Sequence, residues 1–585
     1  MKKSSKLTEV CGLEQRSFVI SILSLILALF AVSIFLVYEY TINLRFHEIY
    51  FYIITILISI AIVVNVLNSR DLLAILALSY SLAVIKFGFL SILPNYILTP
   101  YLDAYVTYQI SSAIIELSYL PSPDVFTQGA QITSSQPIQP ILVAMISKII
   151  GLDIFLVMRY FGCLFALLLP FSFYILFRIF KKIDKTLPKI SSLLFCFSPF
   201  VVFFLTWGHY HNLSLIYFSI ISYYVLKRTA ESNHNSGFFI CAFIASVALV
   251  FAHVYMEILT LILLTSFTLL LLTSPKTQRA TNFVVLYCIL CFMYFVYFGT
   301  RYFYPISTTV EYYFSALIEG NPSRGFSFYF GSGRFIPPFY VVALRYIGAI
   351  SWLLLTFIGF GFWIWKFGRE KAYLYFMLTG ILGIFTATPY LFDPRFGTDL
   401  FYRSLYLWGL MVSAPFAALS FFFIRKKIRN KLLKLFSVLS LIFAVNFGLI
   451  SISIDFQSWN YPILGGEDVR LNYSEWASAG FFASTLLDEK TPVCGLRVGL
   501  GTVGYYARLN YFEIQPSASN LNALVPPEKW EKIKELWTPY CFLRKSITIY
   551  PEIRNYIVDK NDFRKVYVFS DVIYSCNDVF ILKTR

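Results

Sequence analysis

Long apolar runs separated by short polar breaks dominate the pattern of this sequence. An apolar helix needs about 20 residues to cross the hydrocarbon core of a bilayer, and the runs predict about 13 such helices. The candidate spans are Phe18–Tyr38, Ile49–Leu67, Leu72–Leu93, Ile154–Ile179, Ile190–Thr206, Leu213–Leu226, Phe238–Ala252, Val254–Leu272, Phe283–Gly299, Phe339–Trp365, Tyr373–Tyr390, Ser404–Ile424 and Leu432–Ser453. The pattern therefore predicts a polytopic α-helical membrane protein.

Two stretches between the third and fourth spans have a different pattern. From Leu102 to Leu117 the apolar residues fall on one helical stripe, while Thr107, Ser111 and Glu116 fall elsewhere. This pattern is typical of a helix that lies in a membrane–water interface. The apolar run Pro137–Ile150 has only about 14 residues, which is too short to cross. We therefore expect a large loop with two interfacial helices.

The pattern changes again after Ser453, where residues 454–585 are far more polar. Tyr473–Leu487 is predicted to be a helix and Val493–Val498 a strand. Tyr567–Lys583 is predicted to form two strands joined by a turn at residues 576–578. We expect two domains: residues 1–453 as the transmembrane domain, and residues 454–585 as a small α/β or α+β domain.

The basic residues predict an orientation. Lys and Arg favour cytoplasmic loops, so the N-terminus with Lys2, Lys3 and Lys6 is placed inside. When the spans alternate, the inner loops contain Arg70; Arg178, Lys181, Lys182, Lys185 and Lys189; Lys227 and Arg228; Lys276 and Arg279; Lys366, Arg369 and Lys371; and the run from Arg425 to Lys434. This alternation requires that Pro137–Ile150 does not cross. We therefore predict a multi-pass plasma-membrane protein with a cytoplasmic N-terminus and an extracytoplasmic C-terminal domain.

Composition supports the membrane assignment. The chain is 58% hydrophobic and 14% charged, and its mean hydropathy is +0.68. These values lie far from those of soluble domains. A net charge of +16 would suggest nucleic acid in a soluble protein. Here the positive charge is explained by Lys and Arg residues that anchor the cytoplasmic loops of a membrane protein. No nucleic-acid partner is expected.

The cysteines give little support to a metal or redox site. Cys288 and Cys291 form a CxxC inside an apolar run, and no second ligand pair follows. Cys494, Cys541 and Cys576 allow one disulfide and one free thiol, and the sequence does not fix the pairing.

On this topology, ionisable residues collect on the outer face. They are Asp103 and Glu116 in the first large loop, His209 and His211 (TWGHYHN), His253 and Glu257 (AHVYME), Arg345 and Arg403 at span ends, and Arg395 in an outer loop. Ionisable residues are costly within a membrane segment and therefore suggest function.

Each of these residues also has a simpler interpretation. Asp103 would equally suit a solvated loop position or a helix N-cap. Arg345 and Arg403 would also serve as snorkelling anchors. His209 and His211 are two residues apart, so on a helix their rings point in different directions, which argues against a metal pair.

The combination of features resembles the GT-C superfamily of membrane glycosyltransferases. An outer-face Asp begins an interfacial helix, the short helix Pro137–Ile150 follows, arginines mark the outer ends of later spans, and an exterior domain closes the chain. That superfamily includes protein O-mannosyltransferases, lipid A aminoarabinose transferases and oligosaccharyltransferase catalytic subunits. The likeness covers about Leu72 to the C-terminus and is one of layout and motif position.

The resemblance implies a catalytic first-loop acid, and the matching residue is Asp103. The second exterior loop of the family often carries an acidic pair, whereas this chain has His209 and His211 there, a departure from an acidic metal site. The exterior domain has no WWDxG sequence, which argues against an oligosaccharyltransferase.

The reaction that the resemblance implies is inverting transfer of a sugar from a polyprenyl-phosphate donor to a protein, lipid or glycan acceptor. Asp103 would act as the base, and Arg345, Arg395 and Arg403 would bind the donor phosphate. Glu116, His209, His211, His253 and Glu257 would bind substrate or have an accessory role. Membrane lipid is a further expected partner, and a divalent cation is a candidate cofactor. The alternatives are a lipid or polysaccharide transporter or flippase, a glycan polymerase or ligase of another fold, and a non-enzymatic assembly factor. The sugar, the acceptor, the metal requirement and the oligomeric state stay open.

Overall fold

The fold is taken from a computed structural model of the chain. It describes residues 49–92, 102–120, 137–207, 210–230, 236–252, 278–297, 311, 314–315, 318, 339–367, 371–387, 397–459, 493–496, 511–514, 540–544, 570–576 and 579–584. The predicted helices Phe18–Tyr38, Val254–Leu272 and Tyr473–Leu487 lie outside these residues.

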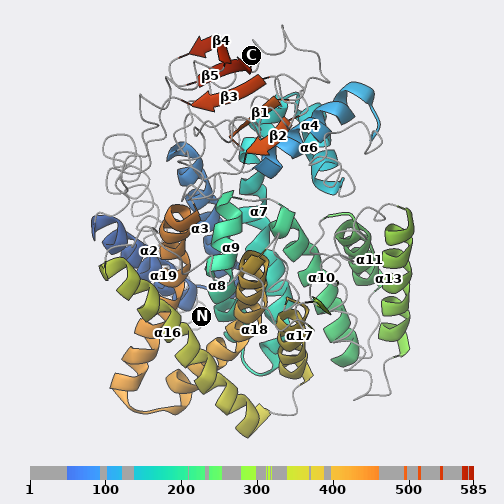
Figure 1. The fold of residues 1–585 in the computed structure, drawn as a ribbon. Helices are drawn as coiled ribbons and strands as arrows, with labels where there is room; N and C mark the ends of the chain where they lie inside the picture. The colour runs from blue at the N-terminus through green and yellow to red at the C-terminus, as the bar shows by residue number, and fades with distance from the viewer. Residues whose placement is uncertain are drawn as a thin grey trace, which may run out of the picture.

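A bundle of apolar helices forms most of the described molecule (Figure 1). Its helices are α2 (Ile49–Asn68), α3 (Asp71–Ile92), α7 (Ile154–Phe177), α8 (Leu187–Cys196), α9 (Pro199–Trp207), α10 (Tyr210–Ala230), α11 (Ser236–Val250), α13 (Gln278–Tyr297), α16 (Phe339–Phe362), α17 (Lys371–Ala387), α18 (Gly397–Lys427) and α19 (Lys431–Trp459). Two short extensions follow α7 and α16, namely the 3-10 helix η2 (Arg178–Lys182) and the π-helix η3 (Trp363–Phe367).

Four helical segments of the described chain are long and apolar enough to cross a membrane. They are Leu156–Lys182, Ala343–Phe367, Leu407–Lys427 and Lys431–Ile450. The membrane assignment made from the sequence is therefore supported, whereas the count of about 13 crossings stays a prediction.

Contacts between α3 and α7 fix the direction in which these helices run. Two hydrogen bonds join them in order: Tyr174 to Asp71, and Ser79 to the Leu167 carbonyl. The residue numbers of the contacting residues rise along α3 and fall along α7, so the two helices are antiparallel. Lys86 is completely buried at this seam.

A second set of contacts aligns α16, α17 and α18. The Trp352 indole donates to Ser413 at 2.7 Å, and Gly359 of α16 faces the backbone of Phe416, so α16 and α18 run in the same direction. Gly383 packs on Trp408 and Gly380 on Val412, so α17 and α18 are antiparallel. Glycine allows these close approaches because it has no Cβ.

One predicted span is wrong in detail. Ile190–Thr206 was expected to form a single helix, but the structure breaks at Phe197 and Ser198 into α8 and α9. Pro199 is the cause, because a proline disfavours helical geometry in the preceding residue and is well suited to begin a helix. The hydroxyl of Ser198 accepts a hydrogen bond from the Val201 N–H at 3.4 Å and caps the start of α9.

Two further helices pack against each other beyond one end of the bundle (Figure 1). They are α4 (Leu102–Leu117) and α6 (Ile138–Ile150). The Ser111 hydroxyl donates to the Thr107 carbonyl in its own helix at 2.7 Å and shares this hydrogen bond with the Pro140 carbonyl of α6 at 3.1 Å. The expected pair of short helices is present, and α6 has 13 residues, too few for a crossing helix.

The C-terminal region contributes five short strands. They are β1 (Val493–Leu496), β2 (Tyr511–Ile514), β3 (Tyr540–Arg544), β4 (Ser570–Cys576) and β5 (Val579–Thr584), in the sheet order β2-β1-β3-β5-β4. The antiparallel β4–β5 pair confirms the predicted terminal hairpin. β1 pairs with β2 and β3 in parallel, with Cys494 opposite Cys541 in the register. Residues 454–585 as a separate domain stay a prediction.

Candidate functional site

One end of the bundle, called here the basic end, gathers loops that are far apart in the sequence. It consists of the α2–α3 turn, η2 with the segment up to Lys189, and the α18–α19 turn. The Tyr174 hydroxyl donates to Asp71 at 2.7 Å, and the Lys189 ammonium donates to the Ser69 carbonyl at 2.9 Å. Loops that the charge pattern assigned to one side therefore lie together.

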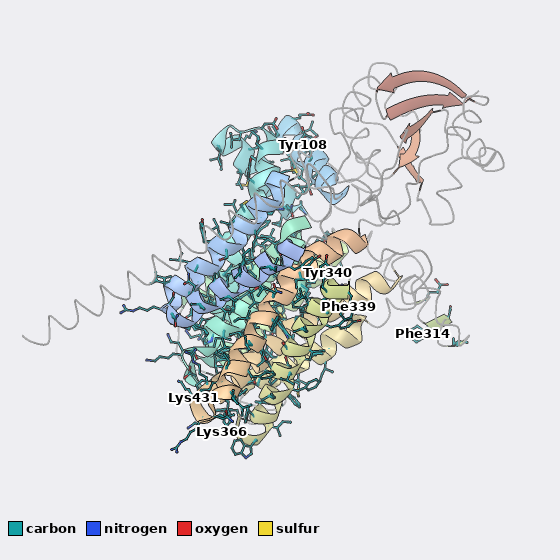
Figure 2. All side chains as sticks on the ribbon, turned by 90° about the vertical axis from the view of Figure 1, so that its left-hand side faces the viewer. Tyr108, Phe314, Phe339, Tyr340, Lys366 and Lys431 are labelled. Carbon is teal, nitrogen blue, oxygen red and sulfur yellow. The ribbon has the colours of Figure 1, made fainter. Side chains whose placement is uncertain are left out.

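Ion pairs reinforce the basic end. Lys181 lies 4.0 Å from Asp71, and Lys426 of α18 pairs with Asp184. Burial alone would raise the pKa of Asp184, but hydrogen bonds from Lys426 and Thr186 hold that pKa below its usual value. Figure 2 shows Lys366 and Lys431 at the same end, far from Tyr108 on α4.

The opposite end, called here the α4–α6 end, collects the starts of other helices. The Ile138 N–H at the start of α6 donates to the Phe251 carbonyl, just beyond α11, at 3.4 Å. Tyr52 near the start of α2 packs edge-on against Tyr340 near the start of α16 at 5.7 Å. Since α18 ends at the basic end and runs with α16, both helices begin at the α4–α6 end.

The predicted base lies at this end. Asp103 is the second residue of α4, which begins at Leu102. A carboxylate in the first turn is favoured by the positive N-terminus of the helix. Glu116 is exposed near the other end of α4, about 20 Å along the axis from Asp103.

Two predicted arginines occupy equivalent positions. Arg345 and Arg403 are each the seventh residue of their helices, α16 and α18. Arg345 lies about 10 Å before Trp352 along the axis of α16, and Arg403 lies about 15 Å before Ser413 along the axis of α18. Because Trp352 and Ser413 are in contact, the backbones of the two arginines lie at similar heights in the bundle. The Arg345 side chain is half-buried.

The histidines and the remaining residues are only partly covered. His211 is the second residue of α10, which places it at a helix start, like Asp103. The others, Arg395, His209, His253 and Glu257, lie outside the residues that the structure describes. Within the described residues no group of three His, Cys, Asp or Glu side chains could hold a metal ion, so a metal requirement stays open.

Two buried polar groups, one on α6 and one on α4, were not predicted from the sequence. Gln139 is 1% exposed, and neither its oxygen nor its nitrogen has a hydrogen-bond partner. The Ser112 hydroxyl on α4 is also buried without a partner. The only signal in the sequence was a glutamine between two prolines in the apolar run PIQPILVAM.

Comparisons with known proteins give structural neighbours only. No protein-family model matches the sequence, and no curated protein matches it. The chain is similar to ArnT from Cupriavidus metallidurans bound to undecaprenyl phosphate, with a TM-score of 0.46 and 12% identity over 86% of this chain and 97% of that one. The apo state of ArnT matches with a TM-score of 0.43 and 11% identity over 83% and 93%.

A second kind of enzyme is also similar. The oligosaccharyltransferase of Archaeoglobus fulgidus, tethered to an acceptor peptide, matches with a TM-score of 0.45 and 14% identity over 92% of this chain and 74% of that one. Both enzymes are glycosyltransferases of the kinds to which the sequence was likened. At these TM-scores the similarity gives no residue-by-residue correspondence.

Proposed function

We propose that this chain transfers a sugar from a polyprenyl-phosphate donor to a protein, lipid or glycan acceptor, with Asp103 as the base. The proposal rests mainly on one observation. Helix α4, with Asp103 in its first turn, packs on α6 and α7 at the end of the bundle where α16 and α18 bring Arg345 and Arg403. The proposed base and the two proposed phosphate-binding arginines are thus on helices that begin at the α4–α6 end.

The reaction divides into two tasks. The acceptor hydroxyl attacks the anomeric carbon while Asp103 takes its proton, and configuration inverts. The bond from that carbon to the donor phosphate breaks, and the phosphate leaves with the electron pair. The phosphate stays attached to the lipid carrier, and its negative charge increases as the bond breaks.

The arginines serve the second task. Guanidinium groups bind phosphate through paired hydrogen bonds, and in a water-poor site they stabilise developing charge strongly. Arg345 and Arg403 suit this role because their helices begin at one end and run in the same direction. Arg395 precedes α18 by two residues and joins them in the proposal.

The proposed orientation follows from the charges. The basic end faces the cytoplasm, as Lys- and Arg-rich loops do. The α4–α6 end then faces outward, where a lipid-linked donor and an exterior acceptor meet, and residues 454–585 form an extracytoplasmic domain.

Purified protein in lipid vesicles with a radiolabelled polyprenyl-phosphate sugar tests the proposal. Label that moves to an acceptor only when the carrier is present supports sugar transfer. Donor that crosses the vesicle membrane without losing its sugar would instead indicate a transporter or flippase, and neither result with any donor would remove both functions.

A further inference from the structure

Gln139 is the most unusual polar side chain among the described residues. Its carboxamide can donate two hydrogen bonds and accept two, yet both polar atoms are buried and neither has a partner. Buried polar groups are nearly always hydrogen-bonded, because an unmet donor or acceptor costs folding free energy. Such a group therefore calls for an explanation.

Buried amides elsewhere in the bundle differ from Gln139. The Asn65 oxygen accepts a hydrogen bond from Ser69 at 2.8 Å, and the Asn446 oxygen lies 3.3 Å from the Ser59 hydroxyl, which also donates to the Thr55 carbonyl at 2.8 Å. In both residues only the nitrogen is without a partner. Among the buried amides of the described residues, Gln139 is the one whose two polar atoms both lack a partner.

The backbone around Gln139 is held on both sides. The preceding residue, Ile138, donates its N–H to the Phe251 carbonyl beyond α11, and the carbonyl of the following residue, Pro140, shares the Ser111 hydroxyl of α4 with the Thr107 carbonyl. The start of α6 is thus tied to two other parts of the fold. A polar side chain on a backbone held in this way, with unmet hydrogen-bonding capacity, suits a preorganised ligand contact.

A second unpartnered group lies on the facing helix. The Ser112 hydroxyl follows Ser111, which bonds to α6, and it is buried without a partner. Helix α6 thus carries an unpartnered amide and helix α4 an unpartnered hydroxyl. Both belong to the end at which Asp103 begins α4.

We propose that the Gln139 carboxamide binds hydroxyl groups of the donor sugar. This inference rests on the proposed function. A neutral amide that both donates and accepts complements neighbouring hydroxyls, which do the same. A phosphate would instead select cationic groups such as arginine. Gln139 therefore selects the sugar, while the arginines hold its carrier.

The test compares two ligands on purified full-length protein. Affinities are measured for bare undecaprenyl phosphate and for undecaprenyl phosphate carrying glucose, mannose, galactose or N-acetylglucosamine. In the wild type, at least one sugar-bearing form is expected to bind more tightly than the bare carrier. In Gln139→Met this preference is expected to fall about tenfold or more, with binding of the bare carrier unchanged.

The matched control is Asn65→Leu, which removes a buried amide at the basic end and should leave both affinities unchanged. If Gln139 has only a structural role, or binds only a buried water, Gln139→Met should have the same sugar preference as the wild type. That result overturns the inference, as does a wild type that binds every sugar form no better than bare carrier. Gln139→Met should also fold at least as stably as the wild type, because it removes unmet polar atoms.

Failure of the inference and failure of the proposed function are distinguishable. A wild type that binds neither the bare carrier nor any sugar form contradicts the proposed function itself. A wild type that binds and transfers, together with a Gln139→Met variant that keeps full sugar preference, contradicts only the role of Gln139. A Gln139→Met chain that does not fold would show that the amide has partners, and this too overturns the inference.

Discussion

The two ends of the helix bundle use their polar side chains differently. At the basic end, Tyr174 meets Asp71, Lys189 meets the Ser69 carbonyl, and Asp184 meets a lysine of α18. At the α4–α6 end, both polar atoms of Gln139 and the Ser112 hydroxyl are buried with no partner, whereas the Asn65 amide at the basic end keeps one hydrogen bond and leaves only its nitrogen unmet.

The difference separates stability from function. Polar groups that satisfy one another hold helix ends in place, whereas unmet groups cost stability and remain only where something offsets that cost. Substitutions at the basic end should therefore change stability and leave sugar transfer intact. Substitutions at the α4–α6 end should do the reverse.

The largest effect on stability is expected between the two ends, at Gly359. A Cβ there would lie 1.8 Å from the Phe416 carbonyl oxygen, so α16 and α18 would have to separate. Gly359→Ala should lower the free energy of unfolding by about 3 kcal/mol, measured as a fall in the thermal midpoint in detergent. Gly361→Ala is the control, because a Cβ there meets nothing within 4 Å. Equal midpoints for the two variants would contradict the close crossing.

A smaller effect is expected at Tyr174. Tyr174→Phe removes the hydrogen bond to the Asp71 carboxylate and should cost about 1.5 kcal/mol, read from denaturant or thermal unfolding. Tyr80→Phe, on the exposed side of α3, should change stability much less. Both variants should transfer sugar at the wild-type rate. Loss of transfer in Tyr174→Phe with unchanged stability would break the separation between the ends.

The smallest effect is expected at Asp184. The lowered pKa of Asp184 in the folded protein means that its ion pair stabilises the fold at neutral pH. That contribution should disappear as pH falls below about 4, through the folded pKa. Because Lys426 is 54% exposed, the effect should not exceed about 1 kcal/mol. The difference in thermal midpoint between wild type and Asp184→Asn should shrink from pH 7 to pH 3, and a constant difference would refute the assignment.

Much of the bundle could be predicted from the sequence, because apolar length and Lys/Arg position follow directly from the physics of a bilayer. The non-crossing Pro137–Ile150 helix was found in this way. The break before Pro199 was missed, since Ser198 lies within an otherwise continuous apolar run and hydropathy alone does not register backbone geometry.

The site was harder to predict. Ionisable residues such as Asp103 and Arg345 stand out in an apolar chain, so their shared end could be inferred from charge alone. Gln139 could not be found in this way, because an uncharged amide on a short apolar helix looks ordinary in sequence. Its significance appears only in the folded chain, where its carboxamide is buried without a partner.

The most direct test of the central claim compares two aspartates near the α4–α6 end in the transfer assay. Asp103→Asn keeps the shape of the side chain but removes its basicity, and Asp153→Asn changes the residue that precedes α7, where Asn is an equally good N-cap. Transfer of label from the polyprenyl-phosphate donor should fall at least about a thousandfold in Asp103→Asn and stay near the wild-type rate in Asp153→Asn. Near-normal transfer by a well-folded Asp103→Asn variant would contradict the account.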